Sequence, residues 1–268
     1  MYKIGLSSCN KVLNDKLFHQ YSISGINAIE ISPAQYEYQD LDYNMIKESA
    51  NNHGIELWSY HLQFSPFEDV EISTIDAGLR KKTVNYYEEL IKKGSSIGIN
   101  KFIIHPSGEP IDDEQRPERI KNSKESLNIL AEIASKEGSI IAVENLPRTC
   151  LGKNSSEILD LISENDKLMV CFDTNHLLCE KISDFINNVG KKIITLHVSD
   201  YDFIDERHWL PGEGKIVWNE VYDLLKKVGY NGVWMYELGF EATNIDRAKK
   251  LCCKDFVNNA NKIFNHQI

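Results

Sequence analysis

The sequence predicts a (β/α)8 TIM barrel formed by a single domain over residues 1–268. Short β-branched runs alternate with longer segments whose apolar residues recur every three or four positions, the pattern of strands joined by amphipathic helices. Eight such units fill the 268 residues at about 33 each, the usual size of this barrel. No stretch rich in Pro, Gly or Ser divides the chain. An open, doubly wound parallel sheet is the alternative that the same alternation allows.

The individual elements follow from apolar runs and from the residues that punctuate them. The expected strands are residues 3–7, 26–32, 55–62, 101–106, 139–145, 167–173, 192–200 and 232–238. The expected helices are residues 12–23, 41–53, 79–97, 117–137, 155–165, 181–189, 217–228 and 243–264. Gly54, Gly98, Gly138 and Gly229 each follow a helical pattern, as residues that end helices do. Asn154 is placed to cap the fifth helix.

Composition narrows the classes of function and location. The net charge of −10 makes DNA or an anionic membrane an unfavourable partner. The six cysteines form no C-x-x-C motif, which indicates reduced, cytoplasmic usage rather than a disulfide framework. The N-terminus lacks the pattern of a signal peptide, and no apolar run approaches the roughly 20 residues that span a bilayer. We therefore expect a cytoplasmic protein.

Polar residues stand at the carboxyl ends of six consecutive predicted strands. They are His61, His105, Glu144, Asp173, His197 and Glu237. In a barrel these strand ends share one rim, where active sites are built, so the side chains can converge although they lie far apart in the sequence.

Such convergence has an electrostatic consequence. Carboxylates gathered from Glu144, Asp173 and Glu237 would repel one another, and a divalent cation would relieve the repulsion. With His197 they form a set of three oxygens and one nitrogen, which suits Mn²⁺, Co²⁺, Fe²⁺ or Zn²⁺ better than Mg²⁺ or Ca²⁺. The sequence therefore predicts one divalent metal ion. The other rim histidines would orient these ligands, contact substrate or bind further metal ions: His61, His105, His176 and His208.

The long segment after the seventh strand supplies further candidates. Arg207 and His208 lie in "ERHWLPGEG", at the same rim, where an Arg can hold a substrate oxygen. Phe64 and Trp209 are placed to shield the pocket from water. The chain has neither a Walker motif nor a convincing G-x-G-x-x-G, so no organic cofactor is expected, and no Ser or Cys stands in a nucleophile elbow.

The motifs "AVENLP", "CFDTNH", "LHVSD", "ERHWLPGEG" and "YELGF", in this order, resemble the xylose isomerase-like TIM-barrel superfamily. That group includes sugar and sugar-phosphate isomerases and epimerases as well as the endonuclease IV repair enzymes. The resemblance covers essentially the whole chain and implies that the single-metal site of the epimerases is formed by Glu144, Asp173, His197 and Glu237. It also implies that His176 and Arg207 contact substrate, and it raises the option of a homo-oligomer.

Two chemical reactions fit this site, and a third alternative is binding without any reaction. In the first, a divalent metal holds a sugar or sugar phosphate while Glu144 and Glu237 move a proton next to its carbonyl. In the second, an endonuclease IV-like site with up to three zinc ions cleaves abasic DNA, and Glu206 stands where that pattern has Asp. The acidic chain and its acidic segment 63–78 disfavour nucleic acid. The third alternative is a barrel that binds a metabolite without converting it. We expect the first, an isomerase or epimerase of a small sugar substrate.

Overall fold

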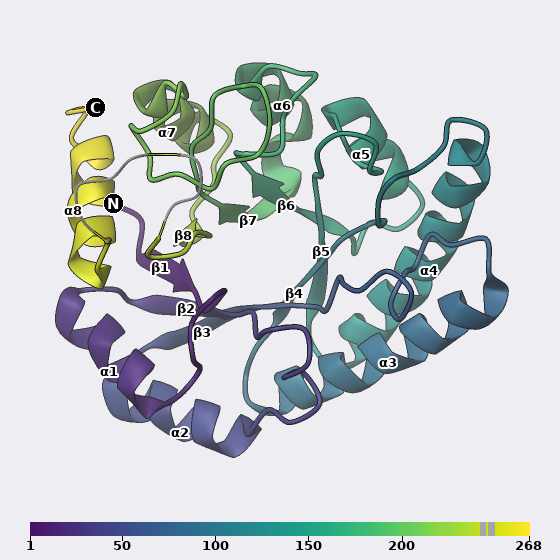
Figure 1. Cartoon of the computed structure of the whole chain (residues 1–268), viewed down its shortest axis with the longest axis horizontal. Coiled ribbons are helices and arrows are strands. Elements are labelled where there is room, and N and C mark those ends of the chain that lie inside the picture. Colours follow the sequence, from purple (N-terminus) through teal and green to yellow (C-terminus); the bar gives the residue numbers. More distant parts are fainter. Residues whose placement is uncertain (242–244, 246–249) are drawn as a thin grey trace.

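Helices and strands alternate throughout the computed structural model, which describes residues 1–241, 245 and 250–268. The strands are β1 (Ile4–Ser7), β2 (Ala28–Ile31), β3 (Glu56–His61), β4 (Lys101–Ile104), β5 (Ile140–Glu144), β6 (Met169–Asp173), β7 (Ile193–His197) and β8 (Trp234–Tyr236). The helices are α1 (Asp15–Ser24), α2 (Tyr43–His53), α3 (Ala77–Ser96), α4 (Arg116–Lys136), α5 (Ser155–Leu161), α6 (Ile182–Val189), α7 (Trp218–Lys227) and α8 (Cys253–Phe264). A short 3-10 turn, η1 (Gly190–Lys192), precedes β7. The helices surround the strands (Figure 1).

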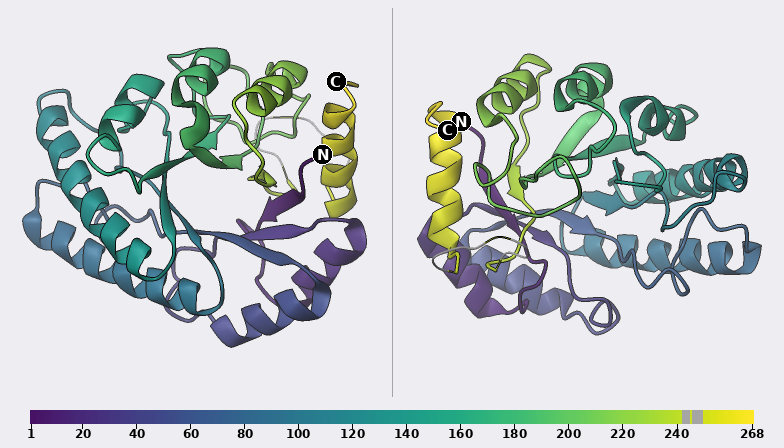
Figure 2. Two further views of the ribbon diagram at one scale, coloured as in Figure 1. Left: turned by 180° about the vertical axis from the view of Figure 1, so that it is seen from behind. Right: turned by 45° about the horizontal axis from the view of Figure 1, so that its top comes forward.

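The strands form one parallel sheet that closes on itself. Their order is β7-β6-β5-β4-β3-β2-β1-β8, and every pair is parallel. The ends of β7 and β8 meet just beyond these ladders, where the Val198 amide donates to the Met235 carbonyl at 2.8 Å. A parallel bridge between Val198 and Tyr236 completes the ring. The predicted TIM barrel is therefore confirmed, and the open doubly wound alternative is wrong; further views show the helices around the ring (Figure 2).

Local signals in the sequence set most helix boundaries. The Asn154 side chain accepts a hydrogen bond from the Glu157 amide at the start of α5, as expected, and Asn14 caps α1 in the same way. Gly54 ends α2 with a φ of +65°, a backbone conformation that costs glycine nothing. The predicted helix over 155–165 ends earlier, at Leu161.

The last helix begins later than the pattern predicted. The expected range was 243–264, but residues 243–244 and 246–249 lie outside the described residues, and α8 begins only at Cys253. A capping box fixes this start, because Asp255 accepts from the Cys252 amide at 2.9 Å. This local hydrogen bonding decides the boundary, whereas apolar periodicity alone does not.

The barrel interior changes from apolar to polar along the strands. Two small buried groups fill its lower part, one of Ala28, Val233 and Met235 and one of Ile103, Ala142 and Cys171. Because side chains alternate between the two faces of a strand, the second residue after each of these faces the same interior. The rim residues that continue this face are His105 after Ile103, Glu144 after Ala142, Asp173 after Cys171 and Glu237 after Met235.

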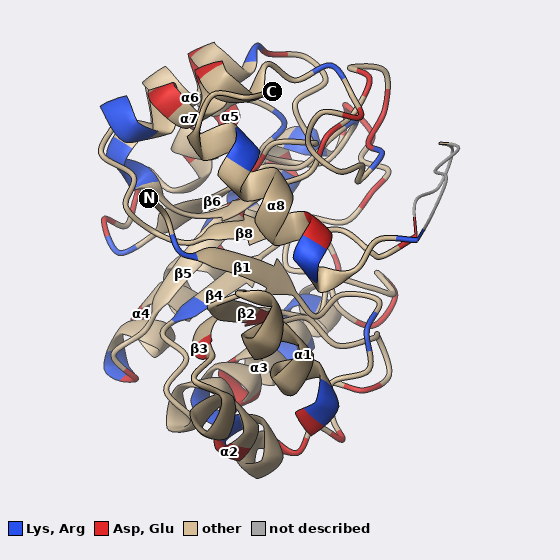
Figure 3. Ribbon diagram, turned by 90° about the vertical axis from the view of Figure 1, so that its left-hand side faces the viewer, with Lys and Arg blue, Asp and Glu red and all other residues tan. Residues whose placement is uncertain are grey.

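Charged groups are frequent outside the barrel as well. Viewed from the side, acidic residues occur in the loops towards which the strands point (Figure 3).

Among the helices that the structure describes, none combines the length and the apolar composition needed to cross a membrane.

Gly94→Ala tests the packing of α3 on the barrel. Alanine favours helices by about 1 kcal/mol over glycine, but a Cβ at this position would lie 2.7 Å from Phe102 and 2.9 Å from Tyr60, both fully buried. We expect a net loss of about 1–3 kcal/mol in the free energy of unfolding, measured by urea denaturation. Lys93→Ala, on the exposed side of the same helix, should change it by less than about 0.5 kcal/mol. A more stable Gly94→Ala protein would contradict the packing.

Candidate metal centre

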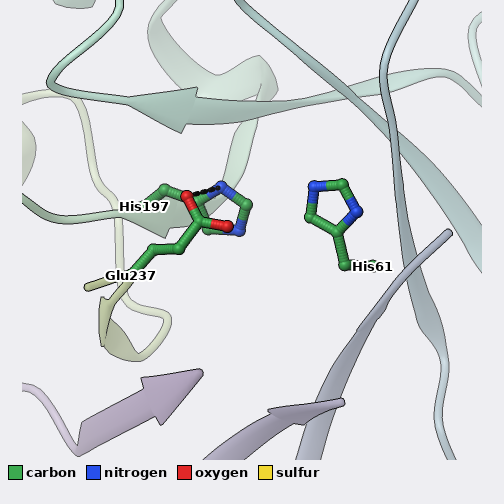
Figure 4. A group of neighbouring side chains, drawn as sticks. All are labelled: His61, His197 and Glu237. Carbon is green, nitrogen blue, oxygen red and sulfur yellow. Dashed lines mark ion pairs between the residues drawn. The ribbon is translucent and has the colours of Figure 1, made fainter. Parts of the chain in front are cut away.

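Four side chains from the ends of neighbouring strands converge at the barrel mouth. Glu144, Asp173 and His197 are the last residues of β5, β6 and β7, and Glu237 directly follows β8. His197 Nδ1 lies 3.2 Å from Glu144 Oε1, 3.2 Å from Glu237 Oε2 and 3.9 Å from Asp173 Oδ2. Glu237 points to the His197 ring, and the His61 ring lies beside them (Figure 4); one ligand atom from each of the three lies within 4.8 Å of the others. The structure thus brings together the four residues predicted as metal ligands.

The four side chains offer their ligand atoms to one point. One ligand atom from each lies within 4.8 Å of the others. Glu144 Oε1, Asp173 Oδ2 and His197 Nδ1 are buried, and none of them makes a hydrogen bond with a residue that the structure describes. Buried polar atoms are almost always paired, so three unpaired ones facing each other need a shared partner. A divalent cation fits, because it accepts carboxylate oxygens and imidazole nitrogen together.

Without a cation, burial disfavours the charged forms of two carboxyl groups in this centre. Burial raises the pKa of Asp173 to about 8, and the carboxylates of Glu144 and Glu237 add to the rise against the opposing effect of His176. Burial also disfavours the charged form of Glu144, but His197 and His105 outweigh it and hold the pKa of Glu144 well below its usual value. Of these two carboxyl groups, Asp173 is therefore the one whose charged form the site disfavours. A cation among the three carboxylates would lower the pKa of Asp173 and bind with release of its proton.

Four more groups of possible ligands overlap or adjoin the first among the described residues, and two of them bear on the number of metal ions. His61 and His105 both approach Glu144 Oε2 with Nε2, at 3.2 and 3.4 Å, and these three residues form one group. His176, Glu206 and His208 form another. Glu144 belongs both to the group with His61 and His105 and to the four-residue group, so it could bridge two cations.

Backbone carbonyls set the tautomer of three rim histidines. Each places Nδ1 near a carbonyl oxygen: His61 at 2.8 Å from Leu62, His176 at 2.9 Å from Asn145 and His208 at 3.2 Å from Glu237. A carbonyl only accepts, so Nδ1 carries the proton and Nε2 has a lone pair whenever the ring is neutral. In His61 and His176 this Nε2 faces a carboxylate, which is favourable only with a proton or a metal ion between them.

The pair formed by His176 and Glu206 shows the proton alternative. His176 Nε2 lies 3.3 Å from Glu206 Oε2. Burial opposes charging of His176, but Asp173 and Glu206 raise its pKa to about 10. The hydrogen bond from His176 lowers the pKa of Glu206 to about 2. Without a metal, a proton therefore holds this pair together.

A buried aspartate anchors the long loop after β7. Asp200 Oδ2 accepts hydrogen bonds from the Gly212 amide at 2.7 Å and from Trp218 Nε1 at 2.9 Å, so it ties both ends of the loop to α7. Gly214 passes so close that a Cβ there would lie 2.3 Å from Asp200 Oδ1. The loop that carries Glu206, Arg207 and His208 is thereby fixed over the barrel mouth.

Two arginines at the rim already have carboxylate partners. Arg207 Nε donates to Asp202 Oδ2 at 2.9 Å. Arg148 pairs with Glu109, Asp205 and Glu206. Arg148 is thus a poor candidate for binding a substrate anion, whereas Arg207 has one carboxylate partner among the described residues and borders the larger of two cavities.

Two adjoining cavities open onto the candidate metal centre. The smaller, of about 180 Å³, is bordered by residues that include His61, His105, Glu144 and His176. The larger, of about 720 Å³, extends over the loops after β1, β2 and β8. Phe64, His208 and Glu237 border both cavities, and the Phe64 ring stacks on His105 at 4.4 Å between centroids. The residues predicted to contact substrate therefore all border one of the two cavities: His61, His105, His176, Arg207 and His208.

One functional candidate escaped the sequence analysis. Glu30 lies within β2, is fully buried, and has Oε2 3.0 Å from His197 Nε2. Its signal is present in "INAIEIS", where a single carboxylate interrupts an apolar strand. Glu30 stands one residue before the end of β2 and inside the predicted strand 26–32, so a search of strand ends passed over it.

The comparisons with known proteins agree with this architecture. The family described as xylose isomerase-like TIM barrel matches residues 18–252. The chain belongs to this family. A D-psicose 3-epimerase of Ruminiclostridium cellulolyticum is 28% identical over 225 residues, which cover 78% of this chain and 72% of that protein. An uncharacterised protein of Methanocaldococcus jannaschii is 29% identical over 195 residues, 69% of this chain and 65% of that protein.

A solved structure extends the likeness in fold to nearly the whole chain. The crystal structure of a D-tagatose 3-epimerase-like protein matches with a TM-score of 0.82 and 24% identity, covering 99% of this chain and 98% of that one. The resemblance drawn from the five motifs is confirmed at the level of family and fold.

Metal addition tests the four-residue centre. We expect Mn²⁺, Co²⁺ or Zn²⁺ at a hundredfold excess over Kd to stabilise the metal-free protein by about 2.7 kcal/mol, since only the folded state gathers the ligands. Asp173→Asn should remove most of this gain, yet be at least as stable as wild type without metal, because it deletes a repelled carboxylate. Thermal unfolding with and without metal measures both effects. Asp40→Asn, at an exposed turn, should respond to metal as wild type does. An undiminished gain in Asp173→Asn would exclude this residue as a ligand.

Proposed function

We propose that this protein is a divalent-metal-dependent isomerase or epimerase of a sugar or sugar phosphate. The observation that carries the proposal is the placement of Glu144 and Glu237, which come from strands separated by β6 and β7, border the same cavity and both face His197 Nδ1. The D-psicose 3-epimerase relative supports this class of reaction. One metal ion, Mn²⁺, Co²⁺, Zn²⁺ or Fe²⁺, is the proposed cofactor, with no organic cofactor.

The proposed reaction is proton transfer at the carbon next to a carbonyl. A divalent cation bound at the centre would polarise that carbonyl and stabilise the charge that develops on its oxygen. Glu144 is held as a carboxylate, since the neighbouring histidines keep its pKa low, and can accept the proton. Glu237 borders both cavities and can deliver a proton to the substrate from a different side. Return to the same carbon from the other face gives epimerisation, and return to the neighbouring carbon gives isomerisation.

The remaining residues of the cavities have binding roles in this proposal. His61, His105, His176 and His208 present ring nitrogens to the smaller cavity, where they would hold substrate hydroxyl groups. Arg207 would hold the far end of the substrate in the larger cavity. Phe64 would exclude water from the side of His105.

Glu237→Gln tests the proposed proton transfer. A panel of ketoses with Mn²⁺ or Co²⁺, analysed by chromatography and by exchange of substrate hydrogen with solvent deuterium, should identify a substrate. For that substrate we expect kcat to fall by about 10²–10⁴-fold in Glu237→Gln, because the amide cannot transfer the proton. Glu164→Gln, on the surface beside α5, should keep kcat. Retention of kcat within tenfold in Glu237→Gln would refute its catalytic role.

A second candidate function is an endonuclease IV-like zinc phosphodiesterase acting on abasic DNA. The observation that favours it is the pair of additional ligand groups, His61 with His105 and Glu144, and His176 with Glu206 and His208. In both groups a histidine directs Nε2 at a carboxylate, since a backbone carbonyl occupies its Nδ1. Several cations sharing Glu144 would activate water and stabilise the leaving oxygen.

Counting metal ions separates the two functions. The phosphodiesterase requires two or three zinc ions per chain by elemental analysis, with about one lost in His105→Ala and about one in His208→Ala, and cleavage of an abasic-site oligonucleotide. The epimerase requires about one ion per chain, and both variants should keep it. Asp173→Asn serves as a control that lowers the count in either case. Cleavage of abasic DNA by the purified protein would refute the epimerase proposal.

A further inference from the structure

The two ring nitrogens of His197 face different partners. Nδ1 points to Glu144 and Glu237 in the proposed metal centre, at 3.2 Å from each. Nε2 points the other way, to Glu30 Oε2 at 3.0 Å. Because a carboxylate only accepts hydrogen bonds, Nε2 carries a proton, and a neutral His197 then has its lone pair on Nδ1.

Glu30 is held in place and sealed from water. It lies in β2 on the interior face, two residues beyond Ala28 of the buried group at the barrel floor, and is 0% exposed. Ser59 Oγ donates to Glu30 Oε2 at 2.8 Å. Its other oxygen, Oε1, makes no hydrogen bond to any residue within the described part of the chain. Glu30 Oε2 also faces the His197 ring, and the two side chains form a fully buried pair.

The His197 ring is restrained on its face as well as on its edge. The His61 ring stacks on it, with centroids 5.6 Å apart and planes inclined by 15°. The contact with Glu30 fixes the rotation of the ring within this stack. The ring can then present Nδ1 to the carboxylates in only one way.

We propose that Glu30 is a positioning residue for the metal centre: it fixes the orientation and tautomer of His197 and increases the electron density that Nδ1 offers to a cation. Outer carboxylates that accept the second N–H of a ligating histidine tune metal affinity in this manner. The inference rests on the metal site of the proposed function, but on neither the substrate nor the direction of proton transfer. A buried ion pair that only stabilises the barrel is the alternative role for Glu30.

The test compares cation affinity in two variants of buried glutamates. Glu30→Gln keeps the size of the side chain and removes its charge. Glu71→Gln is the matched control, because Glu71 is also buried but bonds to Ser73, Gly108 and Arg119, away from the metal centre. The dissociation constants of Mn²⁺, Co²⁺ and Zn²⁺ are measured on metal-free protein by competition with a chelator, alongside urea unfolding of the same preparations.

We expect Glu30→Gln to weaken cation binding by about 10–100-fold, and Glu71→Gln to bind within threefold of wild type even where it unfolds at lower urea. Ser59→Ala, which frees the Glu30 carboxylate but leaves its charge, should give a smaller loss. A Kd within threefold of wild type in folded Glu30→Gln, or equal losses in Glu30→Gln and Glu71→Gln, would overturn the proposal. So would a wild-type protein that binds none of the three cations.

A spectroscopic measurement on the wild type keeps the proposal testable if Glu30→Gln does not fold. Zinc-loaded protein with ¹⁵N-labelled histidine should show a slowly exchanging His197 Nε2–H, assigned by its absence in His197→Asn. A proton on Nδ1 instead would refute the orientation. Loss of affinity in Glu30→Gln without turnover of any ketose would support this role of Glu30 and count against the epimerase proposal alone.

Discussion

Mutual repulsion among buried carboxylates is the constraint around which the barrel mouth is arranged. Glu30, Glu144 and Asp173 are at most 1% exposed, and Glu237 joins them from the edge. Like charges that lie this close together and are buried from water destabilise the fold unless they are compensated. Protonated histidines compensate part of the charge, but burial still raises the pKa of Asp173 to about 8. Three buried atoms of the proposed ligands also make no hydrogen bond to any residue that the structure describes. The scaffold therefore gives up stability here for a site that a cation can stabilise.

The barrel makes this concentration of charge possible through its geometry. Side chains of period two place every second residue inside, so the same strands that fill the floor with Ala142 and Cys171 carry Glu144 and Asp173 at the mouth. The apolar side chains at the floor of the barrel pack the strands together, and a large core between strands and helices surrounds them. Longer-range anchors then hold the rim loops, as Asp200 does for the loop after β7. Three of the four proposed ligands are thus the last residues of strands, and the fourth, Glu237, directly follows β8.

Sequence patterns were informative where a residue's role depends on its place in a strand. The alternation of elements predicted the barrel, and strand ends predicted that Glu144, Asp173, His197 and Glu237 would meet. Glu30 was not predicted, because its partner His197 is 167 positions away and only the closed barrel brings them together. The late start of α8 escaped for a local reason, since hydrogen bonds at Cys252 and Asp255 outweigh apolar periodicity.

Glu144 links the number of metal ions to the kind of chemistry. In the epimerase proposal Glu144 accepts a proton from substrate, so its Oε2 must stay accessible and His61 and His105 must act as substrate contacts or hydrogen-bond donors. If a cation lay between Glu144 and these two histidines, both carboxylate oxygens would be engaged and Glu144 could not accept a proton at neutral pH. Burial lowers the pKa of His105 and so favours the neutral ring that a metal requires. For His61, Glu144 and neighbouring carboxylates outweigh burial and raise the pKa, which favours a hydrogen bond from His61 to Glu144. The balance between these two rings, which approach the same oxygen at 3.4 and 3.2 Å, therefore decides whether Glu144 serves as a base or as a bridge between metal ions.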